Sequence, residues 1–182
     1  MKFTSCCLML LAGAAAAGQS ASPERELAKR VASYMETRKQ ACSDIPKLKD
    51  KAEPDEIASH KRAMAVAIQG ARANARQGDI LTPPVQAYLK QIIRSEMAGK
   101  QGKPAKESAK QGNPEVEGAV PVAVKVNAAY PDGAPLSTVP PTLLQRLPKL
   151  PDGLDFRFVG RDLILRDANA GIIVDFVSNA MP

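Results

Sequence analysis

Hydrophobic residues recur at helical spacing in the segment from residue 22 to about residue 45. Ser22 and Pro23 open this segment, because Ser is a favoured N-cap and Pro fits the first position of a helix. An apolar stripe of Leu27, Val31, Met35 and Cys42 follows at helical intervals. The pattern predicts a helix that ends near residue 45.

Two further helical patterns follow. One begins at Pro54 with acidic residues in its first turn, and its stripe consists of Ile57, Met64, Ile68, Ala71 and Ala75. The other begins at Pro83, with Thr82 as the expected N-cap, and its stripe consists of Val85, Leu89, Ile92 and Ile93. Because the second pattern is rich in Ala, its helix can approach a neighbour closely, and we expect it to pack antiparallel to the first helix.

The hydrophobic pattern breaks off over residues 98–118. Lys, Gly, Pro, Gln and Glu dominate there, and Val116 is the only large apolar residue in this segment. The composition therefore predicts a flexible linker. Val120, Val122, Val124 and Val126 then alternate as in a strand, which Pro121 would confine to a sheet edge. The stretch TLLQRL, residues 142–147, predicts one or two helical turns.

Residues 156–177 carry the most regular alternation in the chain. Gly160 and Arg161 suit a two-residue turn, which pairs Phe158 with Leu163 and Phe156 with Leu165. The next loop, DANA before Gly171, is expected to pair Leu165 with Ile172 and Leu163 with Val174. The pattern predicts a three-stranded antiparallel meander with one buried face, shared by Ile172, Val174 and Phe176 on its last strand. Arg157, Arg166 and Asp175 are expected to form ion pairs on the other, half-exposed face.

These patterns predict an α+β fold. A helical region of antiparallel helices occupies residues 22–97, a flexible linker residues 98–118, and an extended segment with a small antiparallel β-meander residues 119–182. Residues 1–17 have a different character, that of a signal peptide.

The N-terminal residues combine a positive charge, an apolar stretch and a cleavage pattern. Lys2 precedes CCLMLLAGAAAA, and Ala15 and Ala17 satisfy the small-x-small rule for cleavage before Gly18. Ala14 stands where a lipidated Cys would follow LLAG, so lipid anchoring is disfavoured. No later segment of the mature chain is apolar enough to cross a bilayer. We therefore expect a periplasmic or secreted protein.

Composition and charge narrow the function only slightly. The 182-residue chain is 4% aromatic and lacks Trp, so its core must be built from Ala, Leu, Ile and Val. The net charge of +6 allows an anionic polymer as partner, through Lys47, Lys49 and Lys51 and the linker lysines. The same excess also promotes solubility, which is the preferred interpretation. An exposed aromatic sheet is missing from the pattern, so no specific nucleic-acid binding is expected.

Candidate chemistry is sparse. Cys42 is the only Cys that remains after signal cleavage, which excludes an intramolecular disulfide; we expect a small buried hydrophobe, with cross-linking of two copies left open. His60 is the only His and lies beside an apolar stripe, where a packing or hydrogen-bonding role is expected. Asp162 and Asp167 lie beside turns and suit backbone hydrogen bonds, and the acids lack the spacing of a calcium loop. No catalytic, cofactor-binding or metal-binding residue is predicted, and the chain is not expected to be an enzyme.

A resemblance adds to this interpretation. The stretches ARQGDILTPPVQAYLKQII, VNAAYPDGAPLSTVPPTLLQRLPKLPDGLDFRFVGRDLILRD and IIVDFVSNAMP resemble a family of small exported bacterial proteins of unknown function. The tail, from FRFVG to IVDFV, is also weakly similar to the closing β-module of small periplasmic proteins, some linked to nickel and cobalt homeostasis. This chain lacks the His and acidic clusters of a metal handler. The family implies export and supplies no catalytic or binding residues.

The function expected from these observations is that of a non-catalytic exported envelope protein that binds or scaffolds another macromolecule. Two alternatives stay open: an enzyme or enzyme inhibitor with an unrecognised site, and a weak binder of anionic polymers. Partner identity and oligomeric state are not determined by the sequence.

Overall fold

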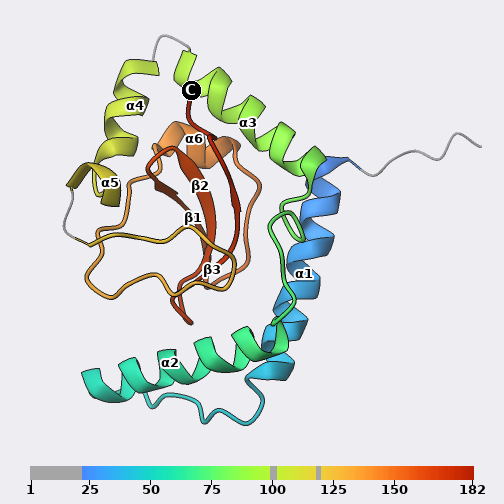
Figure 1. Cartoon of the computed structure of the whole chain (residues 1–182), viewed down its shortest axis with the longest axis vertical. Coiled ribbons are helices and arrows are strands. Elements are labelled where there is room, and N and C mark those ends of the chain that lie inside the picture. Colours follow the sequence, from blue (N-terminus) through green and yellow to red (C-terminus); the bar gives the residue numbers. More distant parts are fainter. Residues whose placement is uncertain (1–21, 99–101, 118–119) are drawn as a thin grey trace, which may run out of the picture.

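The computed structural model describes residues 22–98, 102–117 and 120–182, so the predicted signal peptide lies outside the described residues. The chain has an α+β fold, as predicted, with its sheet at the C-terminal end (Figure 1). The helices are α1 (Pro23–Ala41), α2 (Pro54–Ala71), α3 (Pro83–Ala98), α4 (Gly102–Lys110), α5 (Pro114–Glu117) and α6 (Pro141–Arg146). The strands are β1 (Leu154–Val159), β2 (Asp162–Asp167) and β3 (Ile172–Val177).

The three long helices begin at the predicted prolines. Ser22 caps α1 by accepting the Arg25 N–H, and Glu53 and Glu56 form a capping box at the start of α2. The predicted stripe of α3 is buried, together with Met97. The hydroxyl of Thr82 has no hydrogen-bond partner within the described residues, so its predicted capping bond is wrong. Pro83 and Pro84 follow it directly, and neither has an N–H to donate.

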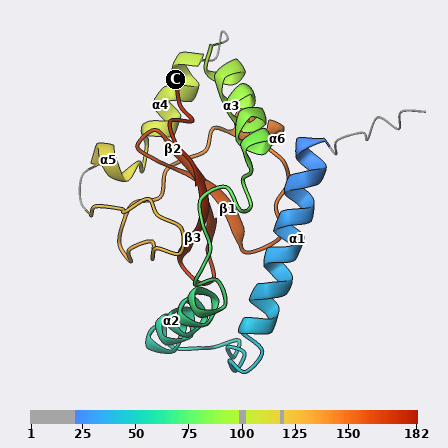
Figure 2. The ribbon, with the colours of Figure 1, turned by 45° about the vertical axis from the view of Figure 1, so that its right-hand side comes forward.

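The predicted antiparallel pairing of the first two helices is wrong. Figures 1 and 2 show α2 running across the end of α1 and of the sheet, not alongside α1. Only Met64 and Ile68 of the predicted α2 stripe are buried, whereas the side chain of Ile57 is 48% exposed. The last turns of α2 pack against the chain before the sheet, where Gln69 donates to the carbonyl of Asn127 over 2.7 Å. The C-terminal turns of α2 are therefore held by packing and hydrogen bonds to the chain before the sheet. Such contacts do not require α2 to lie parallel or antiparallel to α1.

The sheet is a meander of order β1-β2-β3. The first hairpin has the predicted register, with Phe158 opposite Leu163 and Phe156 opposite Leu165. Gly160 takes the expected positive φ of 56°.

The predicted register of the second hairpin is wrong. Asp167 pairs with Ile172, and a bulge between Leu165 and Arg166 then places Leu165 opposite Asp175. Strand β2 extends to Asp167 because this carboxylate accepts the N–H groups of Asn169 and Ala170, both at 3.0 Å, and closes a tight turn. The bulge also separates residues that were expected to share a face: Val174 faces the main core, whereas Phe176 packs on the opposite side.

Both faces of the sheet are covered, whereas one buried face was predicted. The main core lies between one face and the helices. On the other face Tyr130, Val159, Ile164 and Ile173 form a second cluster, with Val122 and Val124 packed against it. The segment 120–139 winds beside the sheet (Figure 2) and forms no strand of its own, only an isolated bridge between Ala129 and Ile172.

Residues 102–117, the described part of the predicted linker, also differ from the expected flexible chain. Helices α4 and α5 lie within them, and Ala105 and Ala109 of α4 are buried. Asn113 is fully buried, and its amide bonds both backbone groups of Gly160, at 2.9 Å and 2.8 Å. The buried Ala105 and Ala109, one turn apart, and the hydrogen bonds between Asn113 and Gly160 thus order a segment whose composition predicts a tether.

Candidate functional site

Asp167 joins the sheet to α1 through buried polar contacts. Its Oδ2 accepts the Tyr34 hydroxyl at 2.7 Å and lies 3.2 Å from Nε of Arg38. Burial and the adjacent carboxylate raise the pKa of Tyr34 above its ordinary value. The predicted turn role of Asp167 is confirmed, and the contacts to α1 are an addition that its position beside a turn does not indicate.

Asp175 joins β3 to the connection between α2 and α3. Its carboxylate accepts the N–H groups of Gly78 at 3.0 Å, Ile80 at 3.0 Å and Leu81 at 2.8 Å, and it is fully buried. Burial raises its pKa, although the backbone donors act in the opposite direction. The predicted ion pair with Arg157 or Arg166 is therefore wrong.

Asp155 is the acid that both of these arginines use. Arg157 Nε lies 3.1 Å from it, and Arg166 Nη2 lies 2.7 Å from it. Arg166 also lies over the ring of Tyr130, 5.3 Å from its centroid. One carboxylate shared by two guanidinium groups leaves local positive charge at this edge of the sheet.

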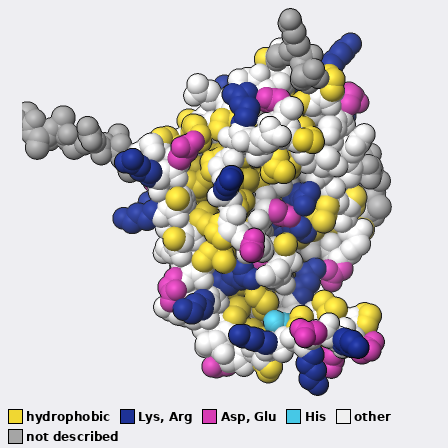
Figure 3. All heavy atoms as spheres, turned by 180° about the vertical axis from the view of Figure 1, so that it is seen from behind, with side chains coloured by type: hydrophobic (Ala, Val, Ile, Leu, Met, Phe, Trp, Pro, Cys, Tyr) yellow, Lys and Arg dark blue, Asp and Glu magenta, His cyan; other side chains and the backbone are white. Residues whose placement is uncertain are grey.

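The first candidate site is an apolar groove next to Asp155 and Arg157. Two hollows of about 560 Å³ and 300 Å³ adjoin the chain before β1 and share Pro148, Lys149 and Leu150. We call them together the Pro148 groove. The larger is lined by Val139, Leu144, Leu154 and Phe156, with Thr138, Asp155 and Arg157 as polar members; the smaller lies against α1, at Glu24, Leu27, Ala28, Val31, Ala32 and Pro151. Figure 3 shows hydrophobic side chains gathered over the face that is seen from behind.

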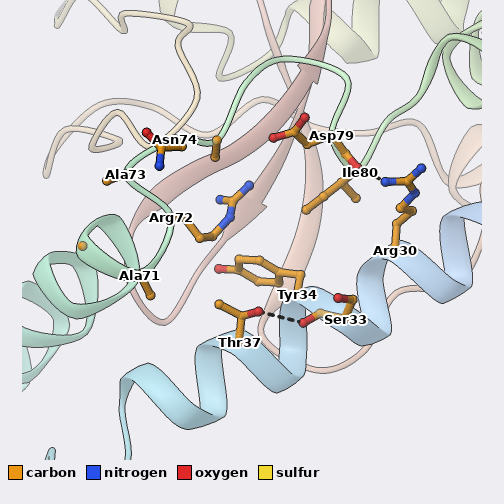
Figure 4. A pocket seen from close by; sticks show the side chains of 12 residues that line it. Arg30, Ser33, Tyr34, Thr37, Ala71, Arg72, Ala73, Asn74, Asp79 and Ile80 are labelled. Atoms are coloured by element: carbon orange, nitrogen blue, oxygen red, sulfur yellow. Dashed lines mark hydrogen bonds between the residues drawn. The ribbon is translucent and has the colours of Figure 1, made fainter.

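The second candidate site is a polar pocket of about 440 Å³ between α1 and the chain that follows α2. We call it the Arg72 pocket. Figure 4 shows its lining: Arg30, Ser33, Tyr34 and Thr37 on α1, and Arg72, Asn74 and Asp79 on the chain that follows α2. The Arg72 guanidinium lies over the Tyr34 ring, 5.1 Å from its centroid. The sequence patterns do not reveal this pocket, because its two walls meet only in the folded chain.

The residues singled out in the sequence do not come together. Cys42 is half-buried against the main core as a free thiol, as expected of a small hydrophobe, and burial raises its pKa. His60 lines a different hollow, and its two ring nitrogens are shielded from solvent without a hydrogen-bond partner within the described residues. Of the two expected roles of His60, packing or hydrogen bonding, the described residues show no hydrogen bond. Lys47, Lys49 and Lys51 are exposed in the loop between α1 and α2.

Among the described residues, no group of three or more His, Cys, Asp and Glu side chains could hold a metal ion. In the same part of the chain, no helix combines the length and the apolar character needed to span a membrane.

Comparison with known proteins found no family model, no curated protein and no solved structure that matches this chain. The resemblance to exported bacterial proteins therefore stays a prediction. The arguments that follow rest on the geometry and charge of the two candidate sites.

Proposed function

We propose that this protein is a non-catalytic exported envelope protein that binds another macromolecule through the Pro148 groove. The partner we propose is a protein that offers an extended, mainly apolar segment with an acidic side chain. The observation that carries this proposal is the pair of apolar hollows that share Pro148, Lys149 and Leu150. Export rests on the signal-peptide pattern of residues 1–17.

The shape of the groove suits an extended chain. Its two hollows share one short segment of the chain, so a ligand that fills both must extend from one to the other. Alternate side chains of an extended peptide point the same way at a spacing of about 7 Å, which would allow one side chain in each hollow. The volumes fall in the range typical of binding sites.

The apolar lining supplies affinity. Leu144, at the rim of the larger hollow on α6, is 58% exposed, and Phe156 contributes to the same lining. Covering such surface removes it from water at about 25 cal/mol per Å² of apolar area. An exposed Leu beside a partly apolar hollow therefore favours a partner that buries it.

Charge indicates an acidic partner. Lys149 belongs to both hollows, and it makes no ion pair within the described residues. Arg157 shares its one carboxylate, Asp155, with Arg166. The larger hollow therefore has two lining cations, Lys149 and Arg157, and one lining carboxylate, Asp155, whereas Glu24 lines the smaller hollow. A carboxylate on the ligand would balance the excess in the larger hollow and fix the direction of the bound chain.

A display library of random peptides tests the proposal. The folded protein should select peptides that combine apolar residues with an Asp or Glu. Lys149→Glu should shift the selected sequences from acidic to basic, because it reverses the charge of a residue that lines both hollows. Selection of no peptide, or of the same acidic peptides by Lys149→Glu, would contradict the proposal.

A matched pair of variants separates the groove from apolar surface in general. Leu144→Asp should weaken the binding of selected peptides by about tenfold or more, since it puts a charge at the rim of the groove. Val66→Asp is the control: Val66 is 68% exposed on α2 and lines no part of the groove. Equal losses in both variants would show that binding depends on exposed apolar surface and not on this groove.

A further inference from the structure

The Arg72 pocket carries one fixed cation and one fixed anion on walls that face the same cavity. Arg72 follows the end of α2, and Asp79 lies in the connection that leads to α3 (Figure 4). None of the residues that line this pocket lines the Pro148 groove. Its possible ligand is therefore a question separate from the partner of the groove.

Arg72 is held in place by neutral groups. Nη1 donates to Oδ1 of Asn127 at 3.0 Å, Nη2 donates to the carbonyl of Val174 at 3.1 Å, and the Tyr34 ring supports the guanidinium from one side. Asn127 in turn donates to the Arg72 carbonyl at 2.7 Å. These contacts use part of the guanidinium's five N–H donors and leave the others for a ligand.

Arg72 lacks the carboxylate that the other partly buried arginines have. Arg38, Arg157 and Arg166 each make an ion pair, whereas Arg72 makes none within the described residues. Burial lowers its pKa, and Tyr34, Asp175 and Asp79 oppose this shift, the two carboxylates from beyond ion-pair distance. The guanidinium stays charged at neutral pH and is thus a preformed site for a carboxylate.

Asp79 supplies the opposite charge. One of its carboxylate oxygens accepts the Arg76 N–H at 2.8 Å, and its main-chain oxygen accepts Nη1 of Arg30 at 3.2 Å. The Asp79 side chain makes no ion pair in the part of the chain that the structure describes. Arg30, the other cation of the pocket, already lies 3.7 Å from Glu26. The charges left for a ligand are therefore those of Arg72 and Asp79.

We propose that the Arg72 pocket binds a small zwitterion of the free amino acid class. Its carboxylate would bind the Arg72 fork, and its ammonium group would bind Asp79. Asp79 would repel a simple anion, and Arg72 would repel a simple cation, so the charge pattern favours a molecule that carries both. The Ser33 hydroxyl and the Asn74 amide, which make no side-chain hydrogen bonds within the described residues, are available for further polar contacts. A volume of about 440 Å³ accommodates such a ligand.

Calorimetric titration of the folded protein with each standard amino acid tests the proposal. At least one should bind with a Kd below about 10 mM, a weak affinity suited to a small ligand in an open pocket. The N-acetyl derivative of that amino acid lacks the ammonium charge, and its methyl ester lacks the carboxylate. Each should bind at least about tenfold more weakly, because each loses one of the two ionic contacts.

Two variants assign the binding to this pocket. Asp79→Asn keeps a side-chain oxygen for the Arg76 N–H but loses the charge, and it should weaken amino acid binding about tenfold without weakening the N-acetyl derivative. Arg72→Lys should weaken both about tenfold, because it loses the planar fork. Asp50→Asn, in the exposed loop between α1 and α2, is the control and should bind as the wild type does.

Three results would overturn the proposal: no amino acid binds in this range, the N-acetyl derivative binds as well as the free amino acid, or Asp79→Asn binds as the wild type does. If Arg72→Lys fails to fold, the derivatives and Asp79→Asn still decide the matter, since neither touches the supporting contacts of Arg72. None of these outcomes depends on peptide binding at the Pro148 groove.

Discussion

At the scale of single residues, two buried carboxylates tie distant parts of the chain together. Asp167 connects β2 to α1 through Tyr34 and Arg38, and Asp175 connects β3 to the backbone of residues 78–81. Both side chains are fully buried. A buried carboxylate is tolerated only when donors replace the water that it loses. Here backbone and side-chain donors do so, which fixes the positions of the segments that supply them.

We expect Asp175→Asn to be strongly destabilising. The substituted amide would turn an NH2 group toward backbone N–H groups that now donate to Asp175, and it would leave buried donors unpaired. The loss in unfolding free energy should reach about 3 kcal/mol or more. Asp162→Asn is the control, since within the described residues the Asp162 side chain accepts one hydrogen bond, from the Asn179 N–H at an exposed position, and the variant should lose about 1 kcal/mol. Chemical denaturation measures both, and equal losses would contradict the anchoring role of Asp175.

Tyr34 should make stability depend on alkaline pH. Its pKa is raised from the ordinary 10.0 by burial, by the charge of Asp167 and by the hydrogen bond to it. Above pH 10 the unfolded chain releases the phenolic proton while the folded chain retains it, so this contribution is full below pH 10 and falls as the pH rises, by up to about 1.4 kcal/mol per pH unit. Tyr34→Phe cannot lose this proton.

The unfolding free energies of wild type and Tyr34→Phe should therefore approach each other as the pH rises. At neutral pH, wild type should be more stable than Tyr34→Phe by about 1–2 kcal/mol, because of the hydrogen bond to Asp167. Urea denaturation at pH 8, 10 and about 11 should show this difference shrinking as the pH rises. A difference that stays constant or grows would mean that the phenol is not protected in the folded state.

At the scale of elements, the helix starts and the first hairpin could be predicted from the sequence, because residues close together in the chain determine them. The starts of α1, α2 and α3 follow from prolines at first helical positions, and the first hairpin follows from Gly160 and the alternation around it. The second hairpin could not be predicted in the same way, because its bulge accompanies the contact of Asp175 with residues 78–81, almost a hundred positions earlier. The buried residues of α4 are Gly102, Ala105 and Ala109, a hydrophobic signal too small to separate this helix from a tether.

The candidate sites were predictable to a smaller extent. The apolar residues that line the Pro148 groove stand out in the sequence only as core candidates, and nothing local indicates that Leu144 stays exposed. Tyr34 comes from α1, Arg72 follows the end of α2, and neither belongs to a recognisable motif. Such sites arise from packing between elements, which periodicity along one element does not reveal.

Ala109→Asp tests whether α4 is part of the folded core. Ala109 is fully buried, so a carboxylate there must either lose its water or displace the helix. We expect amide hydrogens of residues 102–110 to lose protection from exchange, with a loss of about 2 kcal/mol or more in unfolding free energy. Lys106→Asp, at an exposed position of the same helix, should leave both nearly unchanged. Fast exchange of these amides in the wild type would instead support the flexible linker that the composition predicts.

At the scale of the whole molecule, the sheet is enclosed on both sides and α1 contributes to both candidate sites. Leu27, Ala28 and Val31 of α1 face the Pro148 groove, whereas Arg30, Ser33 and Tyr34 line the Arg72 pocket. The same helix is also tied to β2 by Asp167. One rigid helix thus positions a wall of each site. The integrity of α1, including its capped first turn, is a requirement for both proposals.

Export is expected to leave that first turn intact. Signal cleavage after Ala17 would give a chain that begins at Gly18 and keeps Ser22, whose side chain accepts the Arg25 N–H at the start of α1. We expect N-terminal sequencing of the protein from the extracytoplasmic fraction to begin at Gly18 or within a few residues of it. Ala17→Gln should block cleavage, because the site requires a small residue at this position. Ala16→Gln, at the unconstrained position between the two small residues, is the matched control and should be processed normally. A protein that retains Met1, or stays mainly in the cytoplasm, would remove export from the proposed function while leaving the tests of both binding sites unaffected.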